Sequence, residues 1–183
     1  MRKIKYIFFI IIVLVLLGAC SSGDESKESV TGDTIIDIEQ LVHDYSVSSF
    51  EDVSASITST ELIVTDSSDE ESRYDLPVDK FFLSIAPYVE QTHPCEIHSL
   101  TGCQGEMVNE AFTVEILDSD GNIIIDEQME TMANGFIDLW LPRNDNYHMK
   151  VTHEGKIAEA DLSTFDGDQT CITTIKLEEN VDV

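Results

Sequence analysis

The stretch AFTVEILDSDGNIIIDEQM, residues 111–129, decides the fold that we expect. Two runs of alternating apolar and polar side chains, 111–117 and 122–129, flank the turn sequence Asp118-Ser-Asp-Gly121, a combination that is typical of a β-hairpin. Such a series of short strands and turns, if continued, predicts an antiparallel β-sandwich. Four more runs of the same kind follow at intervals of roughly ten residues: 136–142, 147–155, 156–164 and 171–178.

A smaller α+β domain is predicted over residues 34–78, before a longer β-rich domain at 79–183. Short strands are expected at 60–66 and 72–77, on either side of an acidic tip. A more buried strand is expected at 80–89, because an apolar run is ended there by a proline. The predicted fold class is mostly β (α+β), with a small helix-plus-strands piece followed by an antiparallel sandwich-like domain.

One amphipathic helix is predicted inside the α+β domain, over Thr34 to Phe50. Asp33 or Thr34 is available as its N-cap, with Asp37 placed as in a capping box. The helix follows from apolar side chains that recur at helical spacing: Ile35, Ile38, Leu41, Val42 and Tyr45.

The first 20 residues, MRKIKYIFFIIIVLVLLGAC, resemble the leader of a bacterial lipoprotein. Basic residues precede an apolar run too short to be a comfortable membrane span, as in a signal peptide. The ending Leu17-Gly-Ala-Cys20 resembles a lipobox, whose cysteine becomes the lipidated first residue. We therefore expect a signal peptide at 1–19, lipidation of Cys20 and a flexible polar tether at 20–33. The protein is then extracytoplasmic and lipid-anchored to the cell membrane, on its periplasmic side or at the cell surface.

The net charge of the chain limits the classes of partner that we expect it to bind. The formal net charge is −26, and loss of the leader with its three basic residues increases the acidic excess to about 29. So few basic residues argue against binding of nucleic acid or of anionic headgroups through a basic patch. The acidic residues are interleaved with apolar ones, so we expect a folded chain with a well-solvated surface beyond the tether.

The stretch HPCEIHSLTGCQGE, residues 93–106, concentrates two of the five histidines and two of the four cysteines. If Cys20 carries lipid, three cysteines remain in an oxidising compartment, and one of them has no intramolecular partner. One interpretation is a single structural disulfide, for instance between Cys103 and Cys171, with Cys95 left over. That interpretation gives the two histidines of the stretch no role.

The other interpretation is a soft-metal site. Cys95, Cys103 and Cys171 are candidate thiolate ligands, with His98 and His93 beside them, because sulfur and imidazole select Cu(I) or Zn(II) over hard cations. Three thiolates and an imidazole also suit tetrahedral zinc, so the residue types leave the metal open. Redox chemistry is open as well, since two thiols can reduce Cu(II) and close a disulfide that a third thiol reopens.

Other motifs are given structural interpretations. The segment 118–122 resembles a calcium loop but lacks its full ligand pattern, so we expect a hairpin turn. His148 and His153 are five positions apart in one strand and are expected on opposite faces. His43 is expected on the surface of the helix, and Trp140 in the core.

The stretch FFLSIAPYVEQTHPCEIHSLTGCQGE, with downstream NGFIDLWLPR, HEGK and TCITTIKL, resembles the CueP family of exported copper-binding proteins. The resemblance covers about residues 60–178. It implies metal-ligand or redox roles for Cys95, Cys103 and Cys171, with His98 and His93 beside them. It also implies a β-rich C-terminal domain and dimerisation through the N-terminal part. The lipobox and the very acidic surface depart from the picture of a soluble periplasmic shuttle.

The function expected from the sequence is that of a membrane-anchored copper protein. It holds Cu(I) through cysteine and histidine ligands for copper resistance, for buffering, or as a metallochaperone that transfers the metal to an exported cuproenzyme. One alternative is a Cu(II) reductase or thiol oxidoreductase that cycles Cys103 and Cys171 and needs a thiol reductant as partner. Another is a structural β-sandwich lipoprotein with a disulfide and no metal.

Overall fold

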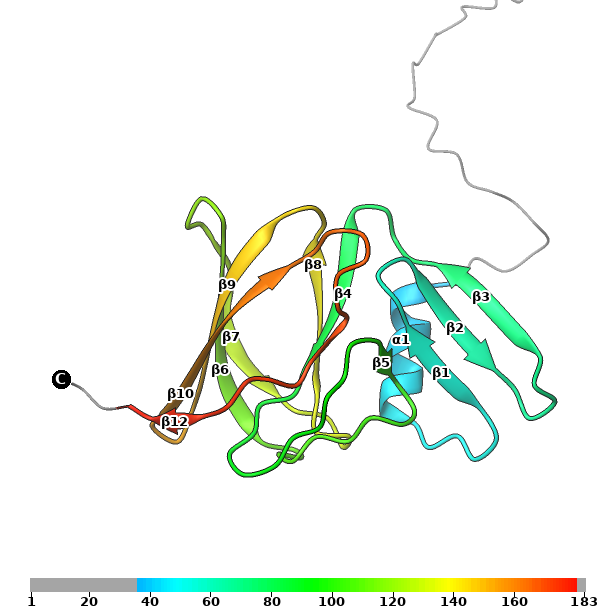
Figure 1. The fold of residues 1–183 in the computed structure, drawn as a ribbon, viewed down its shortest axis with the longest axis horizontal. Coiled ribbons are helices and arrows are strands. Elements are labelled where there is room, and N and C mark those ends of the chain that lie inside the picture. Colours follow the sequence, from blue (N-terminus) through cyan, green and yellow to red (C-terminus); the bar gives the residue numbers. More distant parts are fainter. Residues whose placement is uncertain (1–35, 181–183) are drawn as a thin grey trace, which may run out of the picture. The chain divides into compact units, whose positions relative to one another are not determined.

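The hairpin predicted at residues 111–129 belongs to the largest sheet of the fold (Figure 1). The computed structural model describes residues 36–180, which lie within one compact unit. Strand β6 (Ala111–Asp118) pairs antiparallel with β7 (Ile123–Glu130). The alternation of the sequence is retained in β6, whose apolar side chains are buried while the residues between them face outward.

The acidic segment between these strands is a hairpin turn, as predicted. The Asp118 carboxylate accepts hydrogen bonds from the backbone N–H groups of Asp120 (3.0 Å) and Asn122 (2.7 Å). Gly121 has a φ of 83°, a left-handed conformation that glycine adopts without steric cost. The Asp118 side chain therefore closes the turn.

Two sheets pack face to face around the main core, which confirms a mostly β fold with antiparallel sheets. The five-stranded sheet has the order β12-β10-β9-β6-β7, and the three-stranded sheet has the order β11-β4-β8. Side chains from both sheets form one apolar cluster that includes Phe81, Phe112, Leu139 and Met149. The remaining strands of the two sheets are β4 (Lys80–Ile85), β8 (Ile137–Pro142), β9 (Asn146–His153), β10 (Lys156–Ser163), β11 (Cys171–Ile172) and β12 (Glu178–Glu179).

The single strand predicted at 171–178 is wrong in its extent. The chain forms only β11 there, makes one isolated bridge between Lys176 and Tyr88, and then enters β12. β11 belongs to the three-stranded sheet and β12 to the five-stranded sheet, so the segment must bend to cross between them. β11 also runs parallel to β4, unlike the other pairs of named strands in residues 36–180.

A third sheet accompanies the helix in the N-terminal part. Its order is β3-β2-β1-β5, and α1 packs on it through the buried Val42. The bounds are α1 (Ile38–Val47), β1 (Ser54–Ile57), β2 (Glu61–Thr65), β3 (Glu71–Asp75) and β5 (His98–Ser99). The predicted strands at 60–66 and 72–77 correspond to β2 and β3, whereas β1 was not predicted from its short sequence SASI.

The predicted helix is present, but it begins later than its apolar pattern indicated. Asp37 is itself the N-cap, and its carboxylate accepts a hydrogen bond from the backbone N–H of Gln40 at 3.2 Å. A side chain that satisfies a free N–H of the first turn fixes the start of a helix more sharply than apolar periodicity does. The caps predicted at Asp33 and Thr34 lie outside the described residues.

Side chains from beyond residue 78 complete the apolar cluster under α1. Phe82 of β4 is fully buried in it, and Trp140 of β8 packs edge-on against Phe82 with ring centroids 5.2 Å apart. Trp140 is half-buried, in agreement with its predicted place at the core. Residues on both sides of the predicted domain boundary therefore share this cluster.

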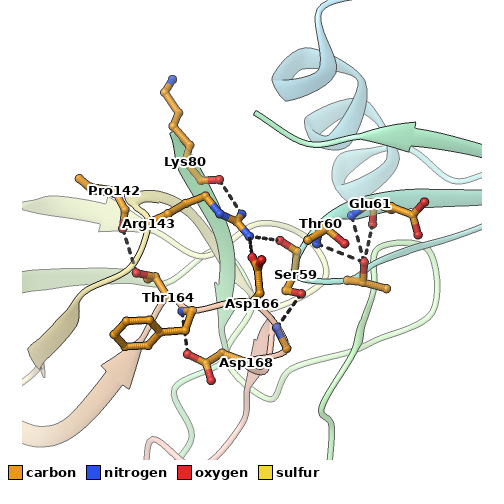
Figure 2. Close-up of polar contacts among 12 residues, drawn as sticks. Ser59, Thr60, Glu61, Lys80, Pro142, Arg143, Thr164, Asp166 and Asp168 are labelled. Atoms are coloured by element: carbon orange, nitrogen blue, oxygen red, sulfur yellow. Dashed lines mark hydrogen bonds and ion pairs between the residues drawn. The ribbon is translucent and has the colours of Figure 1, made fainter. Parts of the chain in front are cut away.

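Arg143 connects the turn before β2 to the end of the three-stranded sheet (Figure 2). Its guanidinium donates to the backbone carbonyls of Ser59 (2.8 Å) and Lys80 (3.0 Å) and to the carboxylate of Asp166 (2.6 Å). Gly167, the next residue, donates its N–H to the Ser59 hydroxyl at 3.0 Å. These bonds fix the loop that precedes β11. No helix in residues 36–180 is long and apolar enough to cross a membrane.

Candidate metal centre

Four of the five residues predicted to form a site lie together. One ligand atom from each of Cys95, His98, Cys103 and Cys171 lies within 4.8 Å of the other three. Two segments supply them, because Cys95, His98 and Cys103 belong to one loop around β5, while Cys171 opens β11. Loop residues distant from Cys171 in sequence thus converge on the sandwich edge.

His98 and Cys171 form the buried floor of this cluster. His98 is fully buried and Cys171 is 1% exposed. The imidazole Nδ1 lies 3.3 Å from the Cys171 sulfur. The backbone of each residue is held by a different sheet, since His98 pairs with Ile57 of β1 and Cys171 pairs with Ser84 of β4.

Thr170 ties these two sheets together immediately beside the floor. Its hydroxyl donates to the carbonyl of Ile57 (2.6 Å) and accepts from the backbone N–H of His98 (3.1 Å). Its own N–H donates to the carbonyl of Glu96, and its carbonyl accepts from Ser84. Thr170 is only 1% exposed, so water cannot replace these hydrogen bonds. Loss of the Thr170 hydroxyl would leave the groups bonded to it unpaired in the interior, which costs free energy.

Cys95 and Cys103 form the half-buried mouth of the cluster, with their sulfurs 3.6 Å apart. The backbone after Cys103 is pinned to the turn before β8, where the N–H of Gly105 donates to the carbonyl of Asn134 at 2.7 Å. A Cβ on Gly105 would lie 2.4 Å from the carbonyl oxygen of Gly135. Only glycine permits so close an approach of two backbones.

Apolar side chains enclose the cluster. Phe136 and Ala86 are buried against Cys171, and Met132 packs on the same group with Cys95 and Cys103. The His98 ring lies between Phe136 (centroids 4.6 Å apart) and Phe82 (6.2 Å). Such a lining keeps the local dielectric low and strengthens bonds between a cation and its ligands.

The donor set fits a soft cation. It contains three thiols and one imidazole, whereas hard cations such as Ca²⁺ take oxygen ligands. His98 Nε2 is the one buried side-chain nitrogen or oxygen in residues 36–180 that lacks a hydrogen-bond partner. The nitrogen that faces the sulfurs is the other one, Nδ1, which lies 3.3 Å from the Cys171 sulfur and is therefore the ligand atom that this imidazole offers.

The three thiols differ in acidity because of their contacts. Hydrogen bonding from Cys171 lowers the pKa of the Cys103 thiol well below its ordinary value, against the effect of burial, and His98 and His93 lower it further. Hydrogen bonding to Cys103 raises the pKa of Cys171, as burial also does. Burial raises the pKa of Cys95. Cys103 is therefore the most acidic of the three thiols.

His93 lies beside the four-residue cluster rather than within it. Its half-buried ring packs edge-on against Phe136 with centroids 6.4 Å apart. It lines an open hollow of about 440 Å³ together with Gln104, Gly105 and Glu106. Glu106 shapes this hollow, because its carboxylate accepts hydrogen bonds from the backbone of Val89 (2.6 Å) and Glu90 (3.0 Å).

Cys95, Cys103 and Cys171 are all free thiols, so the disulfide considered between Cys103 and Cys171 is not formed here. A disulfide requires two sulfurs about 2 Å apart, whereas here three sulfurs surround one point. None of the three thiols is left over, because the sulfur atoms of all three belong to the same cluster of ligand atoms.

The other histidines stand apart from the cluster, as expected. His43 is exposed on α1. His148 lies 3.0 Å from the Asp161 carboxylate, and His153 lies 2.9 Å from the carbonyl of Ala111. The sequence did not predict Thr170, Phe136 and Met132 as part of the site, since a threonine before a cysteine or a methionine in a turn carries no spacing signal of its own.

Comparison with known proteins identifies the family. The family described as "Periplasmic copper-binding protein CueP" matches residues 35–176, well over half of the chain. The chain belongs to the CueP family. A solved structure described as "Crystal Structure of S.CueP" is similar, with 44% sequence identity and a TM-score of 0.73 over 77% of this chain and 88% of that chain. No curated protein sequence matches. The description of the CueP family as periplasmic supports a location outside the cytoplasm.

Replacement of Thr170 by valine is expected to destabilise the protein while replacement by serine is tolerated. Valine keeps the shape but leaves the His98 N–H and the Ile57 carbonyl unpaired, at a cost of about 1–3 kcal/mol in the free energy of unfolding. Urea denaturation of the two variants measures this difference. Equal stability of Thr170→Val and Thr170→Ser would contradict the role given to the hydroxyl.

Cys103 is expected to remain reactive toward iodoacetamide at mildly acidic pH. A thiol with a lowered pKa stays ionised as the pH falls below the ordinary range for cysteine. Replacement of Cys171 by alanine removes the hydrogen-bond donor that is the largest cause of the lowering, so the alkylation profile of Cys103 should shift to higher pH. Mass spectrometry of the reduced, metal-free protein gives both profiles. An ordinary thiol profile in the unmodified protein would refute the assignment.

Proposed function

We propose that this protein binds Cu(I) outside the cytoplasm through Cys95, Cys103, Cys171 and His98. The observation that carries the proposal is the convergence of three sulfurs and one imidazole within 4.8 Å of one another in an apolar setting. Cu(I) is a soft cation that favours this donor set. The description of the CueP family as copper-binding supports the choice of metal.

Zinc is the alternative metal for the same residues. Three thiolates and a histidine satisfy tetrahedral zinc as they satisfy copper. Copper is favoured because the family is described by that metal and because the ligands come from a loop and a distant strand rather than from close Cys-x-x-Cys pairs. His93, at the edge of the neighbouring hollow, is proposed as an accessory residue rather than as one of the main ligands.

The role proposed for the bound metal is copper resistance at the cell envelope, by buffering or by transfer to an exported cuproenzyme. Lipidation of Cys20 would hold the protein at the membrane, and a polar tether would give it reach. The strongly acidic chain favours a partner with a basic docking face, because complementary charge steers association. A homodimer built on the N-terminal part is a further proposal that rests on the family resemblance.

A second candidate function is reduction of Cu(II) by the thiols. The 3.6 Å approach of the Cys95 and Cys103 sulfurs favours it, since both are half-buried at the mouth of the cluster. Two thiols would give one electron to each of two Cu(II) ions, release two protons and join as a disulfide. A thiol reductant would then reopen that disulfide by exchange.

An anaerobic Cu(I) competition titration against a chromogenic chelator tests the proposed function. The reduced protein is expected to remove about one equivalent of Cu(I), whereas a variant with serine at Cys95, Cys103 and Cys171 should remove none. His148→Ala serves as the matched control, because that histidine lies on the exposed face of β9 away from the cluster.

Loss of competition in the serine variant alone supports copper binding by the cluster. Failure of the unmodified protein to compete would overturn it. Turnover of Cu(II) in the presence of a thiol donor, measured separately, would establish the reductase as an additional activity.

A further inference from the structure

Met132 places a fifth soft donor against the thiol cluster. Its half-buried side chain packs on the group formed by Cys171, Phe136 and Ala86, together with Cys95 and Cys103. Met132 is partly buried, as Cys95 and Cys103 are, whereas His98 and Cys171 are buried. A thioether is a soft ligand suited to Cu(I).

Hydrogen bonds hold the backbone that carries this side chain. The N–H of Met132 donates to the carbonyl of Phe136, and the N–H of Gly135 donates back to the carbonyl of Met132, both at 2.8 Å. In the same turn, the carbonyl of Asn134 accepts a hydrogen bond from the N–H of Gly105. Because the segment after Cys103 is bonded to the turn that bears Met132, the backbones that carry the thioether and the Cys103 thiol are held next to each other.

The four ligand atoms of the cluster already satisfy the highest coordination number that a thiolate and imidazole site of this kind takes. A fifth soft donor therefore adds little to the resting site. It can act when one ligand leaves, as must happen whenever copper arrives or departs. A thioether carries no proton to lose, so it is ready to bind at any pH and whether or not the thiols are oxidised.

We propose that the Met132 thioether is a transfer ligand, which binds Cu(I) while the metal moves between an external donor or acceptor and the thiolates. The proposal rests on the proposed Cu(I) function of the cluster. The copper bond passes from a ligand of the partner to the Met132 sulfur and then to a cysteine thiolate, with no change in the oxidation state of copper. Departure of copper follows the same path in reverse.

Stopped-flow measurement of Cu(I) exchange with a chromogenic chelator tests the proposal. A ligand bound only during transfer lowers the barrier in both directions without changing the end states. The Met132→Leu variant should therefore show loading and release rates that are each about tenfold slower, with an equilibrium affinity close to that of the unmodified protein. Leucine has nearly the volume of methionine and preserves the packing.

Met107→Leu is the matched control, because Met107 is also half-buried but packs on the main core instead of on the thiols. It should leave both rates unchanged. Unchanged rates in Met132→Leu would overturn the proposal, as would equal slowing in both variants. A large loss of equilibrium affinity in Met132→Leu would overturn it too, since that result would make Met132 a resident ligand. Absence of any Cu(I) binding by the unmodified protein would refute the proposed function instead.

A second measurement is independent of kinetics. In protein labelled with ¹³C at the methionine methyl groups, partial loading with Cu(I) should broaden the Met132 signal and leave the Met107 signal sharp. The Met132→Leu variant assigns the resonance. A Met132 signal that is unaffected by partial loading would contradict contact between the thioether and the exchanging metal.

Discussion

The hydroxyl of Thr170 is the interaction on which the site depends. It joins the carbonyl of Ile57 in β1 to the N–H of His98 in β5, while the backbone of the same residue bonds to β4. Thr170 is thus a buried bonded link between the helix-bearing sheet and the sandwich, beside the packing of Phe82 and the bonds of Arg143. Cys171 follows Thr170 directly in the chain, so the position of a proposed ligand is set next to this link.

The burial of the site residues decreases from Thr170 toward the surface. Cys171 and His98 are fixed by strand pairing in the interior, Cys95 and Cys103 lie half-buried in the loop, and His93 lines an open hollow beside them. The buried half of the candidate site belongs to the sheets. The accessible half belongs to a loop that is held by the hydrogen bond from Gly105 to Asn134. Such an arrangement suits a metal that must be held firmly and still be exchanged with another protein.

Much of the fold could be predicted because strands with one buried face have sequences in which apolar and polar residues alternate, and this alternation matches their burial. β6, β9 and β10 show it, whereas the exposed β7 does not. β7 was predicted through the turn at Asp118, which carries its own signal. The sequence 171–178 misled because its apolar residues Ile175 and Leu177 are buried in the crossing between two sheets, not in one strand. The alternation of apolar and polar residues indicates which side chains are buried. It does not indicate to which sheet a strand belongs. The start of α1 was misjudged because Asp37 serves as cap.

The candidate site was partly predictable for a chemical reason. Cysteines and histidines are few in this chain, so their concentration at 93–103 pointed to a common role. The contribution of Cys171 followed only from the family resemblance and from its residue type, because nothing in the sequence encodes the parallel pairing of β11 with β4. Thr170 and Met132 could not be found in this way, since their importance lies in contacts between distant segments.

X-ray absorption at the copper edge of protein loaded with one equivalent of Cu(I) tests whether this cluster is the copper site. Copper bound there is expected to have a first shell dominated by sulfur at roughly 2.3 Å, as in metal–thiolate bonds, with an imidazole contribution that disappears in a His98→Ala variant. A first shell of oxygen and nitrogen alone, or one that is unchanged when the three cysteines are replaced, would contradict the assignment of this cluster as the copper site.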